Sequence, residues 1–256
     1  MMRCRRLLID SVKTDLRQRY AGSALGFGWA ILYPALLLSI YATLYAFVFR
    51  IRPDGLTELS YVVLVFSGLV PLLSFNEALM AATGTLLANR GLLLNTVFPA
   101  ELIPVRAVVA AQVPCFVGLC ITLVMAVLQG RASWMTPIAV LVAWVLLVIF
   151  TIGLGWILSL VNLLLRDVQQ GLSLVLMSLF MLSPVAYTPS MVPDGLKLIL
   201  YVNPLAYFVT TFQAAICYGT LPDISTGIAI VSMSLISGTL GFWFFRRTRF
   251  VFFDYA

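Results

Sequence analysis

The sequence predicts an all-α, polytopic membrane protein with six transmembrane helices. Hydrophobic residues make up 62% of its 256 residues and charged residues only 10%, whereas a soluble domain is about 45–50% apolar and about 25% charged. The mean hydropathy is +1.04. No soluble fold of this length could bury so much apolar surface in one core, so the bilayer must act as the solvent. The length suits a single membrane domain.

Six apolar runs are long enough to cross a bilayer, which takes about 20 helical residues. Charged residues bound several of these runs, as when Arg50 and Arg52 follow the first. The predicted spans cover about 29–49, 61–87, 105–128, 137–165, 168–187 and 227–245.

The distribution of positive charge favours six spans over seven. A seventh span would require residues 198–217 to cross, but the Asn203-Pro204 pair interrupts this segment, and proline disfavours helix at the residue before it. With six spans, twelve of the sixteen Lys and Arg residues lie on one side, which the positive-inside rule makes the cytoplasmic side. The other four are Arg50, Arg52, Arg131 and Lys197. We therefore expect both termini in the cytoplasm.

The segment 188–219 follows the fifth span and is predicted to be a periplasmic, re-entrant gate segment. It combines apolar stretches with the Asn203-Pro204 break, so short helices that dip into the outer leaflet account for it better than a full span. Broken backbone at membrane depth is tolerated where it lines a cavity or is buried in protein.

The first 24 residues are predicted to form an amphipathic helix that lies in the cytoplasmic interface. Leu8 or Ile9, then Val12, Leu16 and Tyr20, recur at helical spacing, and basic residues occupy the other face. An unstructured basic tail is the alternative. The six-span domain then covers residues 25–246, and residues 247–256 form a cytoplasmic tail.

Catalytic and nucleotide-binding patterns are absent from the sequence. There is no GxxxxGK[ST] loop to hold ATP phosphates, and there is no histidine for acid–base or metal chemistry. Cys4, Cys115, Cys120 and Cys217 form no CxxC pair. The net charge of +6 follows the ends of the spans, which does not favour nucleic acid as a partner. We expect no enzymatic activity, metal or cofactor in this chain itself.

Glu77 is the one acidic residue well inside a predicted span, and Asn76 lies beside it. A carboxylate exposed to lipid costs at least about 2.5 kcal/mol, so Glu77 should face the protein interior or water. It either lines a pathway or makes a structural hydrogen bond between helices.

Aromatic residues recur on one face of two predicted spans. Tyr33 and Tyr41 lie eight residues apart in the first span, and Phe180 and Tyr187 lie seven apart in the fifth. Aromatic rings in such rows suit sugar rings, which present apolar C–H faces. The alternative is ordinary packing or an interfacial belt, where Tyr and Trp are enriched.

The segment 88–104 connects the second and third predicted spans on the cytoplasmic side. It is moderately apolar, and Pro99 and Pro104 flank Glu101. A short segment of this kind either packs on the membrane surface or docks into the cleft of a partner protein.

Five short motifs follow one another along this six-span frame. They are RYAGS at 19–23 with Trp29 and Pro34 after it, NTVFPAELIP at 95–104, LRDV at 165–168, SPVAY at 183–187 and NPL at 203–205. In this order they resemble the motifs of the permease subunits of bacterial ATP-binding-cassette type 2 exporters. That family moves O-antigen, capsular polysaccharide and teichoic acid. The segment NTVFPAEL lacks the basic pair that the family pattern suggests.

The resemblance implies a homodimer that works with a separate ABC ATPase subunit, which would bind ATP and magnesium. The implied cargo is a lipid-linked glycan, carried across the bacterial inner membrane between the two copies, with membrane lipids around them. A different lipid, a small amphiphile or a secondary-transport function are the alternatives that the sequence leaves open.

The resemblance also assigns roles to particular residues. Residues expected to couple the chain to the ATPase are Arg17, Arg19, Asn95, Phe98, Pro99 and Glu101. Residues expected to line the passage, between spans one, two and five, are Tyr33, Tyr41, Asn76, Glu77, Phe180 and Tyr187. Residues expected to form the outer gate are Pro184, Asn203 and Pro204.

Overall fold

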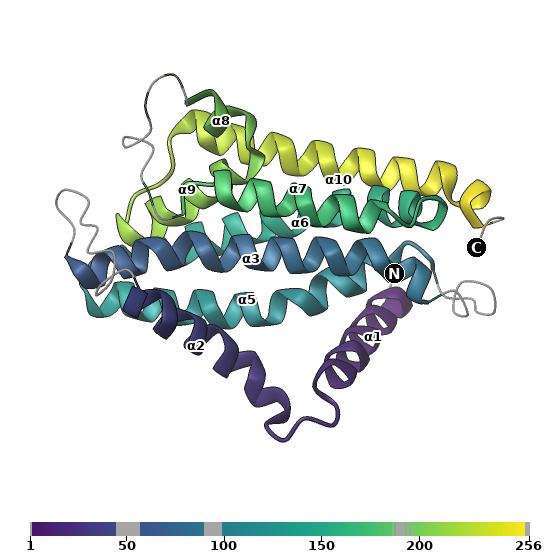
Figure 1. Ribbon diagram of the computed structural model, residues 1–256, viewed down its shortest axis with the longest axis horizontal. Coiled ribbons are helices and arrows are strands. Elements are labelled where there is room, and N and C mark those ends of the chain that lie inside the picture. The colour runs from purple at the N-terminus through teal and green to yellow at the C-terminus, as the bar shows by residue number, and fades with distance from the viewer. Residues whose placement is uncertain are drawn as a thin grey trace.

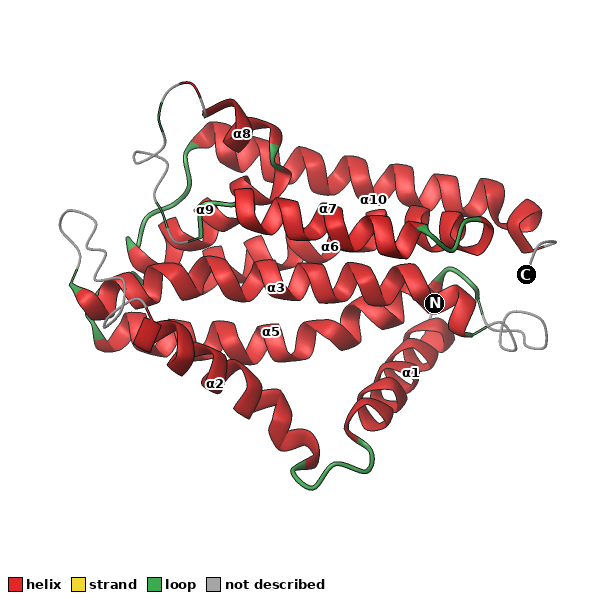
Figure 2. Ribbon diagram, viewed as in Figure 1, coloured by secondary structure: helices red, strands yellow, loops and turns green. Residues whose placement is uncertain are grey.

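The protein is built from helices throughout the part of the chain that the structure describes (Figure 2). The structure is a computed structural model that describes residues 2–44, 57–89, 99–185, 187, 193, 195 and 197–253. Within these ranges, four helices are long and apolar enough to cross a membrane. They are α3 (Glu58–Ala88), α5 (Leu102–Leu128), α6 (Thr136–Leu164) and α10 (Ile224–Phe253), the last through its residues Ile224–Thr248.

The predicted fifth span corresponds to a shorter apolar helix, and so does the described part of the first span, whose residues 45–49 lie outside the described ranges. These are α2 (Trp29–Thr43) and α7 (Val168–Leu182), of 15 residues each, or about 22 Å at 1.5 Å per residue. Helix α7 stops at Leu182 because Ser183 is extended (φ −81°, ψ 141°) and precedes Pro184. The prediction that helix continues to Tyr187 is therefore wrong. An all-helical polytopic membrane protein is confirmed, while the count of six spans stays a prediction.

Helix α1 (Met2–Tyr20) replaces the unstructured tail that the sequence also allowed. Leu8, Val12, Leu16 and Tyr20 are half-buried, whereas Ile9 is exposed, so Leu8 begins the inward face. Helix α1 lies against α5. The 3₁₀ turn η1 (Gly26–Gly28) leads from it into α2, and the two helices form a V beside the bundle (Figure 1).

The segment 188–219, predicted to hold short re-entrant helices, contains α8 (Lys197–Val202) and α9 (Pro204–Cys217). The predicted break at Asn203-Pro204 is confirmed. Helix α9 begins near the middle of α3, where Phe208 packs with Phe150 and Phe75. It ends at the start of α3, where the Cys217 thiol contacts the Ser60 carbonyl oxygen at 3.7 Å. The helix therefore runs along only about half of α3.

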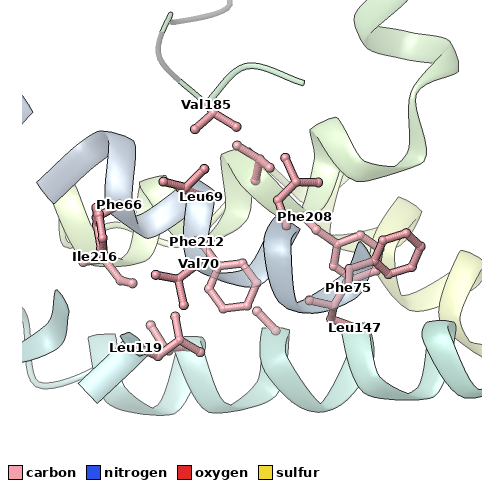
Figure 3. Packing of buried hydrophobic residues seen from close by; sticks show 14 of the residues in the cluster. Phe66, Leu69, Val70, Phe75, Leu119, Leu147, Val185, Phe208, Phe212 and Ile216 are labelled. Atoms are coloured by element: carbon pink, nitrogen blue, oxygen red, sulfur yellow. The ribbon is translucent and has the colours of Figure 1, made fainter. Parts of the chain in front are cut away.

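Helix α3 forms the centre of the core, and 83% of its most apolar 18-residue stretch is buried. It packs on α5, α6 and α9. Figure 3 shows Phe75 and Phe208 near Leu147, with Ile216 beside Phe66. The stacked rings of Phe75 and Phe150 lie 5.8 Å apart. Helices contributed by distant parts of the sequence thus share one apolar cluster.

Small residues bring α6 and α10 into direct backbone contact. A side chain at Gly153 would collide with the backbone of Ser237, and one at Gly241 would collide with the backbone of Gly153. The Ser237 hydroxyl donates to the Phe150 carbonyl oxygen at 2.9 Å. Close approach at glycine and serine is a common way for membrane helices to associate, because lipid gives helices no hydrophobic reason to pair.

The two ends of the bundle differ in the elements that they carry. The C-terminal ends of α3, α6 and α10 lie at one end, and the start of α3, the end of α5 and α8 lie at the other (Figure 1). Helices α3, α6 and α10 therefore run in one direction and α5 in the opposite one, as the predicted spans require (Figure 1).

Candidate functional site

The V-shaped α1–α2 unit is fixed to the bundle by two ion pairs. Arg19, near the end of α1, pairs with Glu77 in the middle of α3. One turn earlier in α1, the Asp15 carboxylate lies 2.8 Å from the Arg106 guanidinium of α5. Arg106 also donates to the Asn89 side-chain oxygen at 3.2 Å, at the end of α3. Three helices are therefore joined by charge at one corner of the protein.

The two pairs differ in their burial. The Asp15 and Arg106 side chains are 21% and 12% exposed, while those of Glu77 and Arg19 are 48% and 32% exposed. Burial raises the pKa of Asp15 above its ordinary value, although the positive charges of Arg106 and Arg19 oppose the rise. Burial likewise raises the pKa of Tyr20. The Asp15 pair thus pays a desolvation cost that offsets part of its Coulomb attraction.

Two adjoining cavities open beside Glu77. The first, of about 270 Å³, is lined by Arg19, Tyr20, Trp29, Tyr33, Glu77 and Pro114. The second, of about 290 Å³, shares Tyr33, Glu77 and Pro114 and continues between apolar side chains such as Leu37 and Val70. Together they form a pocket region that is polar and aromatic near α1 and apolar deeper between α2, α3 and α5.

The predicted passage residues are not all brought together. Tyr33 is exposed and shares both cavities with Glu77. Tyr41 packs against the core cluster instead, and so does Phe180 from α7. The Tyr187 hydroxyl donates to the carbonyl oxygen of Leu182 at 2.9 Å, within its own segment.

Asn76 lies beside Glu77 in α3 but differs in its surroundings. Its side-chain oxygen is buried and has no hydrogen-bond partner among the described residues. A buried acceptor without a partner costs about 1–3 kcal/mol. In the described part of a single protomer, the side-chain oxygen of Asn76, next to Glu77, therefore lacks a hydrogen bond.

The predicted gate residues are joined by the Asn203 side chain. Its amide nitrogen lies 2.9 Å from the Ser183 hydroxyl and 3.3 Å from the Leu179 carbonyl oxygen, at the end of α7. Its side-chain oxygen accepts from the Leu205 amide at 3.0 Å and caps α9. Pro204 occupies the first turn of α9, where a missing N–H costs nothing.

A second side chain, that of Gln213 in α9, holds Pro184. The Gln213 amide donates to the Pro184 carbonyl oxygen at 2.9 Å and to that of Val185 at 3.2 Å. The side chains of Asn203 and Gln213 thus both bind the SPVAY segment, which begins 20 residues before Asn203.

The predicted coupling residues are described only in part. Asn95 and Phe98 lie outside the described residues. Pro99 and Glu101 precede α5, and the Trp156 indole donates to the Glu101 carbonyl oxygen at 2.9 Å, fixing that turn on α6. Arg17 is exposed on α1.

Several residues of these sites were missed in the sequence. Asp15 was not singled out, Arg106 was counted only as one cytoplasmic charge, and Gln213 was taken as part of an apolar run. Two sequence features indicated that these side chains need polar partners. They are an acid on the basic helix α1 and a glutamine inside the apolar stretch of α9. Neither indicates its partner, which is more than 25 residues away.

Comparison with known proteins identifies the family. The sequence profile described as ABC-2 type transporter matches residues 8–217, which is most of the chain. The chain belongs to the ABC-2 type transporter family. As an ABC-2 permease it is a multi-pass membrane protein, and ATP hydrolysis resides in a partner subunit.

Curated relatives of this ABC-2 permease match almost from end to end. The O-antigen export system permease protein RfbA of Myxococcus xanthus is 31% identical over 236 residues, covering 91% of this chain and 88% of the relative. RfbA of Klebsiella pneumoniae is 29% identical, covering 84% and 82%. The polysialic acid transport protein KpsM of Escherichia coli is 27% identical, covering 87% and 84%.

Proposed function

We propose that this ABC-2 permease exports a lipid-linked polysaccharide, of the O-antigen or capsule type, across the bacterial inner membrane. One observation carries the proposal: relatives named for O-antigen export and polysialic acid transport match more than four-fifths of the chain. The aromatic residues beside Glu77 support it, because Tyr and Trp rings suit the apolar faces of sugars.

The charge distribution supports a cytoplasmic location for both termini. Twelve of the sixteen basic residues belong to the side that carries the termini in the six-span arrangement. The C-terminal ends of α3, α6 and α10 lie together at one end of the bundle (Figure 1). In this orientation α8 and the end of α9 lie toward the periplasm (Figure 1).

We infer that a second copy of the chain covers α2 and α7. Large apolar side chains on both helices are exposed in the single protomer, including Ile31 and Ile40 of α2 and Leu174 and Met177 of α7. The passage would then run between the copies, with Tyr33, Glu77 and Asn76 toward it.

The coupling proposal centres on α1 and the segment 88–104. The ATPase would dock beneath the cytoplasmic end of the bundle, against Asn95, Phe98, Pro99 and Glu101 and against Arg17 of α1. Arg19 would then carry movement of α1 to Glu77 in α3 through their ion pair. The segment joining α7 to α9 through Pro184, Asn203 and Pro204 would respond as the outer gate.

The test is deletion of the gene in a strain that makes a surface glycan. Loss of that glycan together with accumulation of its lipid-linked form inside the cell is expected, and the wild-type gene should reverse both. Purification should recover an ATPase whose hydrolysis depends on lipid and on this chain. Normal surface glycan in the deletion strain would contradict the polysaccharide cargo, and accumulation of a different lipid would point to the alternative cargo.

A further inference from the structure

A cavity separate from the Glu77 region lies between α8, α9 and the beginning of α10. Its volume is about 740 Å³, within the about 300–1,000 Å³ of ligand-binding pockets. Helix α8 and the start of α10, which contribute to its lining, lie at the end of the bundle opposite the C terminus (Figure 1). The lining residues that matter here are Lys197, Tyr201, Tyr207, Thr210, Asp223 and Thr226.

Two tyrosines supply the aromatic part of this cavity. The Tyr207 hydroxyl donates to the Tyr201 carbonyl oxygen at 3.1 Å, which holds the Tyr207 ring between α8 and α9. The Tyr201 side chain is 67% exposed, so its ring is available to a ligand. A tyrosine ring combines an apolar face with a polar edge, which matches a sugar ring and its hydroxyls.

Hydrogen-bonding groups complete the lining. The Asp223 carboxylate is exposed and makes no hydrogen bond or ion pair with other described residues. The Thr210 hydroxyl donates to the Ala206 carbonyl oxygen at 2.9 Å, so its own lone pairs remain able to accept a hydrogen bond. Thr226 adds another hydroxyl, and the charged side chains in the lining are one cation, Lys197, and one anion, Asp223.

We propose that this cavity binds uncharged sugar units of the glycan as it leaves the transporter. The combination of aromatic faces, a carboxylate and hydroxyl groups favours a polyhydroxylated ligand, and the balanced charge favours a neutral one. A phospholipid headgroup is less suited because its phosphate would meet Asp223. The proposal rests on the proposed function, since it places a saccharide at the periplasmic end.

The test measures saccharide binding to the full-length protein in lipid nanodiscs. The probe is a fluorescently labelled, lipid-free oligosaccharide, released by mild acid from the surface polysaccharide of the producing strain. We expect Tyr201→Ala and Asp223→Asn each to raise the Kd roughly tenfold, the scale of one lost aromatic or polar contact. Tyr218→Ala is the matched control, because Tyr218 is exposed at the end of α9 but does not line the cavity.

Competition experiments identify the ligand class. Unlabelled oligosaccharide should displace the probe, and glycerophosphoglycerol, the headgroup of phosphatidylglycerol, should not. Displacement by the headgroup, equal binding by all variants, or no binding by the wild type would overturn the sugar pocket. None of these outcomes bears on the deletion experiment, in which loss of surface glycan tests the proposed function separately.

Discussion

The Asp15 carboxylate and the Arg106 guanidinium form an ion pair of 2.8 Å that fixes α1 to α5. The pair stands between the helix expected to meet the ATPase and a helix of the membrane bundle. It is mostly buried, so each partner depends on the other to offset its desolvation. A movement of α1 must therefore either move α5 with it or separate Asp15 from Arg106.

Charge reversal tests this connection. Arg106→Asp places two carboxylates together and should destabilise the docking of α1 by about 1.5–3 kcal/mol, the value of a hydrogen bond to a charged group. Asp15→Arg should act similarly, and the double variant should recover most of the loss. The measurement is the distance between spin labels on α1 and α5 in nanodiscs, with surface glycan as the functional readout. A double variant as impaired as the single ones would argue against a direct role for the pair.

The Arg19–Glu77 pair gives a second prediction. Glu77→Gln should impair export more than the Arg19→Gln, Glu77→Gln double variant, because the single change leaves a cation without its partner while the double change leaves none. Thermal unfolding in nanodiscs and surface glycan are measured together. Arg17→Gln, an exposed position on the same helix, serves as the stability control. If the double variant is worse than Glu77→Gln, each side chain has a role beyond the pair.

The pH dependence of α1 docking follows from the raised pKa of Asp15, which burial causes and Arg106 and Arg19 oppose. A carboxyl whose folded-state pKa exceeds its unfolded value binds protons more tightly when docked. Its contribution to docking is therefore full below the unfolded pKa and is lost as the pH rises through the raised value. Lowering the pH from 7 toward 5 should keep α1 docked or tighten it. Spin-label distances measure this, and release of α1 on acidification would contradict the prediction.

An Asp15→Asn variant tests whether Asp15 is the group that makes the docking of α1 depend on pH. Asparagine keeps the shape of aspartate but carries no charge to desolvate, so the pH dependence of docking should flatten. Its effect on stability should be smaller than that of Asp15→Arg. A pH dependence unchanged in Asp15→Asn would assign the titration to another group.

The contact between α6 and α10 predicts a strong effect from one added methyl group. Gly241→Ala forces a side chain onto the backbone of Gly153 and should lower stability by about 1–3 kcal/mol, the usual cost of overpacking. Gly227→Ala in the same helix is the matched control, since nothing lies within 4 Å of its added carbon. The unfolding midpoint in nanodiscs compares them. Equal midpoints would mean that α6 and α10 separate easily enough to admit the methyl group.

Asn203, a residue of the proposed outer gate, both caps α9 and binds the end of α7. Asn203→Ala removes both interactions and should cost about 1–3 kcal/mol of local stability. Asn203→Asp keeps the oxygen that accepts from Leu205 but loses the donor to Ser183, so its effect should be intermediate. Amide hydrogen exchange over the last turn of α7 and the first turn of α9 measures the change. An Asp variant equal to wild type would show that only the cap matters.

Sequence reasoning placed most helices well because the bilayer imposes length and composition on each span locally. The runs predicted at 61–87, 105–128 and 137–165 agree with α3, α5 and α6 within three residues. The run at 227–245 agrees with the start of α10, but this helix continues to Phe253, into the predicted tail. The break at Asn203-Pro204 was visible for the same reason: proline restricts its neighbour whatever surrounds it. The end of α7 at Leu182 was missed, although Pro184 carried the same signal.

The candidate sites were less accessible to sequence reasoning. Tyr33 and Glu77 were predicted to share a surface and do share two cavities, whereas Tyr41 and Phe180 pack on the core. Helical spacing gives the face of a residue on its own helix, but it does not say which helix covers that face. The roles assigned to Asn95 and Phe98 stay predictions, because both lie outside the described residues.

The sequence by itself determined that this chain is a helical membrane protein, where its helices break and which family it resembles. Each of these follows from local composition, proline geometry or motif order. Only the tertiary structure decided that Asp15 finds Arg106, that Arg19 finds Glu77 and that Asn203 ties α9 to α7. These partners lie 20 to 91 residues apart, and a polar side chain in an apolar setting must find whichever partner the packing of helices places within reach.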